Sequence, residues 1–240
     1  YLYRSTHALG ATDSYGITEI YASASSGVDY QPNWSNQDRT ISAVATDTYS
    51  TNDACVARGS NAEFVIDAST GIMSVSGNTP RYYCVVDHTN VEVTAYGKRG
   101  TESASKSYQG LTVVARSRHN DYTDDYCMAR GYYFRLYNSG KACFLKEFIH
   151  SDDCLVYASG NPCVDISALT KGVWYGIKFV IRNNANVVHL EGYMDYDGGS
   201  NGGAWQKILE YDDDGNWLAD VASNEQGCMN TCGYNGDEMW

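Results

Sequence analysis

The candidate catalytic side chains of this sequence are cations, bases and phenols on predicted strands. A lyase that cleaves uronate polysaccharides by β-elimination needs three groups. A cation neutralises the carboxylate, a base removes the neighbouring ring proton, and an acid protonates the leaving oxygen. Candidates exist for each role: Arg135, Arg116 or Lys146 as the cation, His150 or His119 as the base, and Tyr193 or Tyr133 as the acid. The set favoured for such a lyase is His150, Tyr193, Arg135 and Lys146. These residue types follow no fixed spacing, so they do not by themselves select an enzyme.

Carboxylates suggest a second chemistry. Glycosidases use two carboxyl groups on either side of the bond that is cleaved, and Glu92 and Glu191 are candidates whose separation the sequence leaves open. The sequence contains no nucleophile elbow, no phosphate-binding loop and no metalloprotease helix. These absences favour a non-enzymatic module over a catalyst.

Acidic loops suggest a third possibility, which is calcium binding. Segments 195–199 (DYDGG) and 212–216 (DDDGN) place oxygen ligands at alternate positions, and Asp195 and Asp197 are the candidate ligands. Neither segment has the full twelve-residue calcium loop with its distal glutamate. Because Asp, Asn and Gly are ordinary turn residues, turn formation explains these segments as well, and no cofactor is required.

Strand patterns dominate the rest of the chain. Residues 63–67 and 72–76 flank a glycine-containing turn, which is typical of a β-hairpin. Apolar and polar residues alternate over residues 91–96, 173–182 and 188–195, as expected for strands with one buried face. Further strands are predicted at residues 111–119, 129–137, 142–150 and 205–211.

The hairpin around residues 138–141 (NSGK) determines which side chains share a face. With Ser139 and Gly140 as a two-residue turn, the numbers of opposing residues sum to 279, because 139 and 140 do. Lys146 is then opposite Tyr133 on the polar face. The opposite, core face carries Phe134, Leu136, Cys143, Leu145 and Ile149, with Arg130 and Glu147 near its end. A slip of one residue would reverse every one of these assignments, so they depend on the register.

Alternation in the neighbouring strands extends this polar face into a predicted ligand-binding surface. Its members are Arg116, Arg118, Tyr133, Arg135, Lys146, His150, Trp174, Lys178, His189 and Tyr193. Aromatic rings stack on the C–H faces of sugars, and Arg and Lys bind carboxylates, so an acidic glycan suits this set. A polar face is also the ordinary solvated side of an antiparallel sheet, and both interpretations remain open.

The cysteines indicate an oxidising compartment. The chain has 8 of them: Cys55, Cys84, Cys127, Cys143, Cys154, Cys163, Cys228 and Cys232. Their spacing does not match a tetrahedral zinc site, so disulfides in an extracellular or cell-surface protein are the better explanation. We expect Cys127 and Cys154 to lie near each other at the base of the second hairpin. The sequon at Asn33 predicts a glycan there.

Charge and hydropathy exclude other classes. The formal net charge of −12 argues against binding nucleic acid, and no apolar run is long enough to span a membrane. The chain begins at Tyr1 without an initiator Met, from which we expect a processed or partial chain.

The predicted fold is all-β, an antiparallel β-sandwich of jelly-roll type cross-linked by disulfides, with little helix. Residues 13–240 are expected to form a single domain. Residues 1–12 are expected to form an extended segment that can donate a strand to another copy of the chain.

Several segments resemble a group of secreted concanavalin-type jelly-roll proteins that includes polysaccharide lyases and sugar-binding modules. They are residues 13–21 (DSYGITEIY), 146–150 (KEFIH), 172–178 (GVWYGIK), 188–193 (VHLEGY), 205–207 (WQK) and 214–217 (DGNW). Residues 148–150 are only similar to the Gln-Ile-His motif of alginate lyases, and the arginine-rich strand of those enzymes is not matched. The resemblance implies a jelly roll that acts on or binds polysaccharides.

These observations favour an extracellular glycan-binding or glycan-carrying structural module. The alternative is a lyase that cleaves uronate-containing polymers by β-elimination. The resemblance implies a further strand beyond residues 238–240. An open sheet edge is then expected, and strand exchange through residues 1–6 would make the protein a surface-layer or filament subunit.

Overall fold

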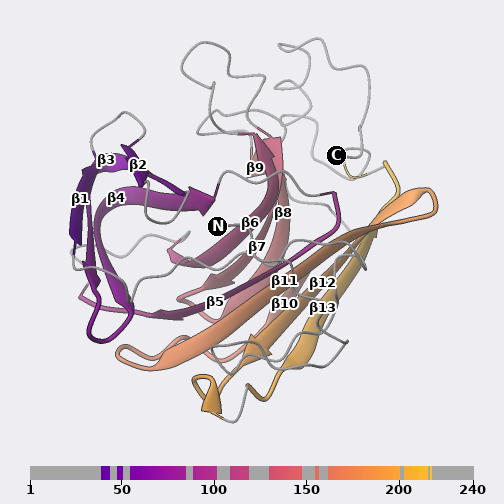
Figure 1. Cartoon of the computed structure of the whole chain (residues 1–240). Coiled ribbons are helices and arrows are strands. Elements are labelled where there is room, and N and C mark those ends of the chain that lie inside the picture. The colour runs from indigo at the N-terminus through magenta and orange to yellow at the C-terminus, as the bar shows by residue number, and fades with distance from the viewer. Residues whose placement is uncertain are drawn as a thin grey trace. The chain divides into compact units, whose positions relative to one another are not determined.

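The computed structural model describes residues 39–43, 48–50, 55–84, 89–101, 109–118, 130–147, 155–156, 162–200, 203–215 and 217. These residues form antiparallel β-sheets, and no helix occurs among them, which confirms the all-β prediction (Figure 1). None of the described segments is a helix long and apolar enough to cross a membrane. The strands fall into two compact units, β1–β4 and β5–β13, while the single domain expected over residues 13–240 remains a prediction.

The first unit is one four-stranded sheet. Its strands are β1 (Arg39–Ala43), β2 (Thr48–Ser50), β3 (Cys55–Asp67) and β4 (Ile72–Cys84). β3 pairs with β1 and β2 along one edge and with β4 along the other. The β3–β4 hairpin confirms the first predicted turn. Gly71 takes a φ of 65°, and the Asp67 carboxylate accepts hydrogen bonds from Ser69 and Thr70.

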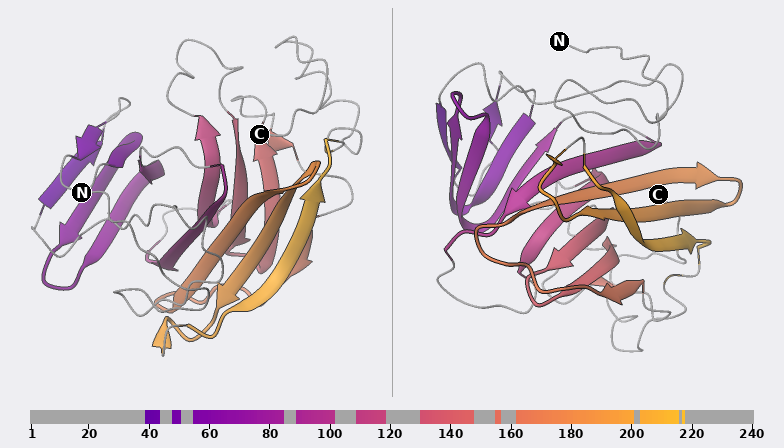
Figure 2. Two further views of the ribbon diagram at one scale, coloured as in Figure 1. Left: turned by 45° about the vertical axis from the view of Figure 1, so that its right-hand side comes forward. Right: turned by 90° about the horizontal axis from the view of Figure 1, so that it is seen from below.

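The second unit contains two sheets. One, called the β11 sheet here, has the order β13-β12-β11-β5 and consists of β5 (Val91–Lys98), β11 (Trp174–Asn184), β12 (Val187–Asp195) and β13 (Gln206–Asp213). The other, the β7 sheet, has the order β10-β8-β7-β6, with β9 also pairing with β8. It consists of β6 (Gly110–Arg118), β7 (Arg130–Tyr137), β8 (Lys141–Glu147), β9 (Leu155–Val156) and β10 (Cys163–Asp165). The strands of the two sheets lie face to face in Figure 2.

One hydrophobic core joins the two sheets of this unit. It includes Tyr132, Phe134, Leu136 and Phe144 from the β7 sheet and Tyr175, Ile177, Phe179, Ile181, Leu190 and Met194 from the β11 sheet. The alternation predicted for β11 and β12 is therefore confirmed, because every second residue points into this core. Val173 is an exception to the predicted apolar face, since it precedes β11 and is exposed.

The register predicted for the β7–β8 hairpin is wrong by one residue. Tyr137 pairs with Lys141, so the turn contains three residues and opposing numbers sum to 278. Gly140, with a φ of 98°, donates its N–H to the Tyr137 carbonyl and supplies the extra turn residue. Lys146 consequently faces the core opposite Tyr132, and Cys143 and Leu145 lie on the other face with Tyr133.

A disulfide between Cys143 and Cys163 links β8 to β10, at positions that are paired directly in the sheet. It confirms the prediction that disulfides cross-link the chain. Cys55 and Cys84 are paired backbone positions of β3 and β4. Cys127, Cys154, Cys228 and Cys232 lie outside the described residues, and with them the expected proximity of Cys127 and Cys154.

Candidate polar site on the outer face of the β11 sheet

The face of the β11 sheet that points away from the core carries a set of polar side chains that bind one another. It is called the outer face here. Its side chains are Glu92, Thr94, Tyr96 and Lys98 from β5, Trp174, Lys178 and Arg182 from β11, His189, Glu191, Tyr193 and Asp195 from β12, and Lys207, Glu210 and Asp212 from β13. The predicted membership of Trp174, Lys178, His189 and Tyr193 in one polar face is thus correct. Lys178, His189, Glu191 and Asp195 are also buried, which is unusual for charged groups outside a core.

Strand register aligns three glutamates in a row across this face. Val180 of β11 pairs with Glu92 on one side and with Glu191 on the other, and Glu191 pairs in turn with Glu210. The separation of Glu92 and Glu191, which the sequence left open, is therefore two strand spacings, or about 10 Å between their Cα atoms. The row brings carboxylates from three strands onto one surface.

His189 is the centre of the densest cluster on the outer face. Its Nδ1 lies 2.5 Å from Asp212 Oδ1, and its Nε2 lies 2.9 Å from Glu191 Oε1 and 3.4 Å from Glu210 Oε1. The hydroxyl of Tyr193 donates to Glu191 Oε2 at 2.5 Å. These contacts join neighbours on the same or an adjacent strand, so the sheet fixes the geometry of the cluster.

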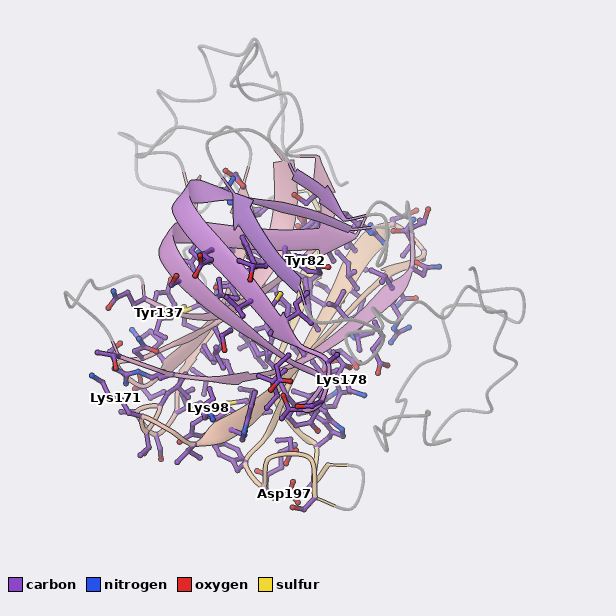
Figure 3. The ribbon with its side chains drawn as sticks, turned by 60° about the vertical axis from the view of Figure 1, so that its left-hand side comes forward. Tyr82, Lys98, Tyr137, Lys171, Lys178 and Asp197 are labelled. Atoms are coloured by element: carbon purple, nitrogen blue, oxygen red, sulfur yellow. A yellow bond between two sulfur atoms is a disulfide. The ribbon has the colours of Figure 1, made fainter. Side chains whose placement is uncertain are left out.

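Lys178 forms a second cluster beside the first. Its Nζ lies 2.5 Å from Glu92 Oε1 and 4.7 Å from the centre of the Trp205 ring (Figure 3). Trp205 lies over Gly176, where an added Cβ would be 2.7 Å from the indole and 2.9 Å from Tyr96. The absence of a side chain at position 176 therefore lets two aromatic rings approach the backbone of the sheet.

Lys98 and Trp174 form a third polar contact on this face. The ammonium of Lys98 lies 4.9 Å from the centre of the Trp174 ring, across the β5–β11 pair. Tyr96, Trp174 and Trp205 are each half-buried. The outer face thus presents partly accessible aromatic surface next to fixed charges.

Asp195 organises the loop that follows β12. Its carboxylate accepts hydrogen bonds from the N–H groups of Asp197, Gly199 and Ala204 and from the hydroxyl of Tyr96. Burial acts to raise the pKa of Asp195, but these hydrogen bonds outweigh it and hold the pKa below its usual value. The pKa of exposed Asp197 is raised by its hydrogen bond and charge interaction with Asp195. These bonds fit the turn interpretation of residues 195–199.

The predicted ligand surface did not place Lys146 correctly. Lys146 is fully buried in the core, where its Nζ pairs with Asp213 Oδ2.

Arg116 is half-buried on β6 near Tyr132. Its burial lowers its pKa, and the charge interaction with Tyr132 partly offsets this effect. The pairing of β6 is irregular between Ala115 and Arg118, so the alternation from which a shared face was predicted for Arg116 and Arg118 is interrupted there. The side chain of Arg118 lies outside the described structure.

Tyr133 and Arg135 lie on the outer face of the β7 sheet, away from the β11 sheet. The Tyr133 hydroxyl donates to Glu147, and Arg135 binds Thr112 and lies over the ring of Tyr137. The described members of the favoured lyase set are therefore not brought together, since Tyr193 and Arg135 lie on opposite outer faces of the unit and Lys146 lies in the core. His150, His119 and Asn33 lie outside the described residues.

Sequence reasoning missed the contributions of Tyr96, Trp205, Lys207, Glu210 and Asp212. Alternation over residues 205–211 was a usable signal for a strand. However, the pairing between β12 and β13 shifts at Gly192 and Tyr193, and this irregularity determines which β13 residues meet His189 and Glu191.

Comparison with family models, curated proteins and solved structures returns no match to this chain, so the resemblance to concanavalin-type proteins remains an expectation.

Proposed function

We propose that the protein is an extracellular module that binds carbohydrate on the outer face of the β11 sheet. The observation that carries the proposal is the placement of Tyr96, Trp174 and Trp205 on one face, with Trp205 against both Tyr96 and the buried Lys178. Aromatic rings provide stacking surfaces for sugars, and fixed donors and acceptors bind sugar hydroxyls. The Cys143–Cys163 disulfide supports the extracellular location.

The charges of the outer face favour a hydroxyl-rich glycan over a strongly anionic one. Lys178 is paired with Glu92, and Lys207 is paired with Glu210 at 2.6 Å. Cations already neutralised by carboxylates on the same surface gain little from a further carboxylate. The aromatic and hydrogen-bonding groups then supply most of the affinity, which makes binding weakly dependent on salt.

Binding is favoured over elimination by the predicted lyase set, because its described members Tyr193, Arg135 and Lys146 share no surface. Arg135, on the outer face of the β7 sheet, is separated from Tyr193 by both sheets, and Lys146, in the core, is separated from it by the β11 sheet. A glycan at Asn33 and strand exchange through residues 1–6 remain predictions that concern residues outside the described structure.

Two arginines on opposite outer faces provide a matched test. Arg182 lies on the outer face of the β11 sheet, and Arg135 lies on that of the β7 sheet. Binding to a panel of neutral and acidic polysaccharides should be measured by affinity electrophoresis. We expect Arg182→Gln and Trp174→Ala to weaken binding several-fold or more and Arg135→Gln to leave it unchanged. Loss of binding in Arg135→Gln alone would place the ligand on the other sheet, and no binding to any polymer would refute the proposal.

A further inference from the structure

We propose that His189, Glu191 and Glu210 form a binding site for a divalent transition-metal ion such as Zn²⁺. One ligand atom from each residue lies within 4.8 Å of the others, and Glu210 Oε1 and Glu191 Oε1 both converge on His189 Nε2. Around a tetrahedral zinc ion with bonds of about 2.0–2.1 Å, neighbouring ligand atoms are about 3.3 Å apart. The two distances from Nε2, 2.9 and 3.4 Å, are close to that spacing.

Outer partners orient all three proposed ligands. Asp212 holds His189 Nδ1 at 2.5 Å, the Tyr193 hydroxyl holds Glu191 Oε2 at 2.5 Å, and Lys207 Nζ holds Glu210 Oε2 at 2.6 Å. In each case the held atom is not the one that faces the cluster. A hydrogen bond to the other polar atom of each side chain fixes the orientation of that side chain, so that its proposed ligand atom points into the cluster. Outer partners orient histidine and carboxylate ligands in the same way in known metal sites.

Cations lie at the edge of the proposed site. Lys207 Nζ and a guanidinium nitrogen of Arg182 lie 3.7 and 3.8 Å from Glu191 Oε1. The case for a metal ion is the convergence of the two glutamate oxygens on His189 Nε2, with the outer partners that orient all three side chains.

The site has a route for entry of the ion. His189 and Glu191 are buried, whereas the side chain of Glu210 is 48% exposed. An ion bound by three protein ligands at this border would direct its remaining coordination position to solvent. A mixed nitrogen and oxygen ligand set favours Zn²⁺ or a similar transition metal over Ca²⁺, which prefers oxygen ligands.

Metal titration of the full chain tests the site directly. After treatment with EDTA, we expect isothermal titration with Zn²⁺ to give one saturable site and Co²⁺ to give a visible absorption band. Glu210→Gln should weaken Zn²⁺ binding more than tenfold, and this variant changes an exposed side chain, so its fold is least at risk. Asp212→Asn should weaken binding about 10- to 100-fold through the orientation of His189.

Glu63→Gln is the matched control, because Glu63 is an exposed strand carboxylate in the first unit. Unchanged affinity in Glu63→Gln together with weakened affinity in Glu210→Gln supports the site. Equal affinity in both variants, or no saturable binding up to millimolar Zn²⁺, overturns it. The metal site does not depend on the proposed glycan binding, and the titration contains no carbohydrate. A negative titration would therefore refute the metal site and leave the proposed glycan binding untouched.

Discussion

Lys146 Nζ lies 2.7 Å from Asp213 Oδ2 in the core between the β7 and β11 sheets, and neither side chain is exposed to solvent. The Tyr132 hydroxyl donates to the same Asp213 oxygen at 2.5 Å, and the rings of Tyr132 and Trp217 lie 5.5 and 5.9 Å from the ammonium group. A buried lysine is tolerated only with such compensation. Lys146 therefore has a structural explanation that requires no ligand.

Replacing Lys146 with Met should destabilise the protein by about 3–5 kcal/mol, because Asp213 would remain charged and buried without its cation. The double variant Lys146→Met/Asp213→Asn should recover part of the loss. Urea unfolding gives the free energies. Lys141→Met is the control, since Lys141 is exposed at the start of the same strand and should change stability by less than about 0.5 kcal/mol. Equal losses for the two lysines would contradict the importance of the pair.

Periodicity of two residues predicted the outer face of the β11 sheet well. In β12, His189, Glu191 and Tyr193 alternate with Leu190 and Met194, so the polar and core faces differ sharply in composition. A slip of one residue would bury charged groups against apolar ones, and such a strand has only one favourable orientation.

The β7–β8 hairpin lacks that contrast. Tyr133 and Leu145 on its outer face are large, largely apolar and buried, as are Phe134 and Phe144 on its core face, so the composition of the two faces does not distinguish the two registers. The length of the turn determines the register, and the third turn residue, Gly140, shifts Lys146 to the core face. The His189 cluster was unpredictable for a different reason, because it depends on the pairing of β12 with β13 and on the irregularity in that pairing.

Gly192→Ala should destabilise the protein by about 1–3 kcal/mol, because a Cβ at this position would lie 2.6 Å from the ring of Phe134 on the opposite sheet. The ring is packed against Phe144 and Phe179 and has little freedom to move. Thermal unfolding measures the effect. Gly100→Ala is the control, since nothing lies within 4 Å of the added Cβ there. Similar melting temperatures for Gly192→Ala and the unchanged protein would argue against close packing at this point.

Replacing Cys143 and Cys163 together with Ser should lower stability by about 3 kcal/mol. The disulfide closes a loop with a sequence separation of 20, and its loss returns conformational entropy to the unfolded chain. Denaturant unfolding of the oxidised protein and of the double variant gives the difference. A loss below about 1 kcal/mol would mean that the pairing of β8 with β10 suffices without the bond.

Asp195→Asn should destabilise the protein at neutral pH by about 1–3 kcal/mol, because an amide cannot accept with both of its terminal atoms from the four donors that surround Asp195. Since the pKa of Asp195 is lowered in the folded state, its stabilising effect is complete above the usual value of 3.8 and disappears as the pH falls through the lowered pKa. Unfolding free energies of the two proteins should therefore differ by a constant amount from pH 7 to about pH 4 and converge in more acidic solution. Asp197→Asn, at an exposed position, should have a smaller effect. Convergence already at pH 6, or an equal loss from Asp197→Asn, would show that the buried Asp195 carboxylate does not anchor this loop.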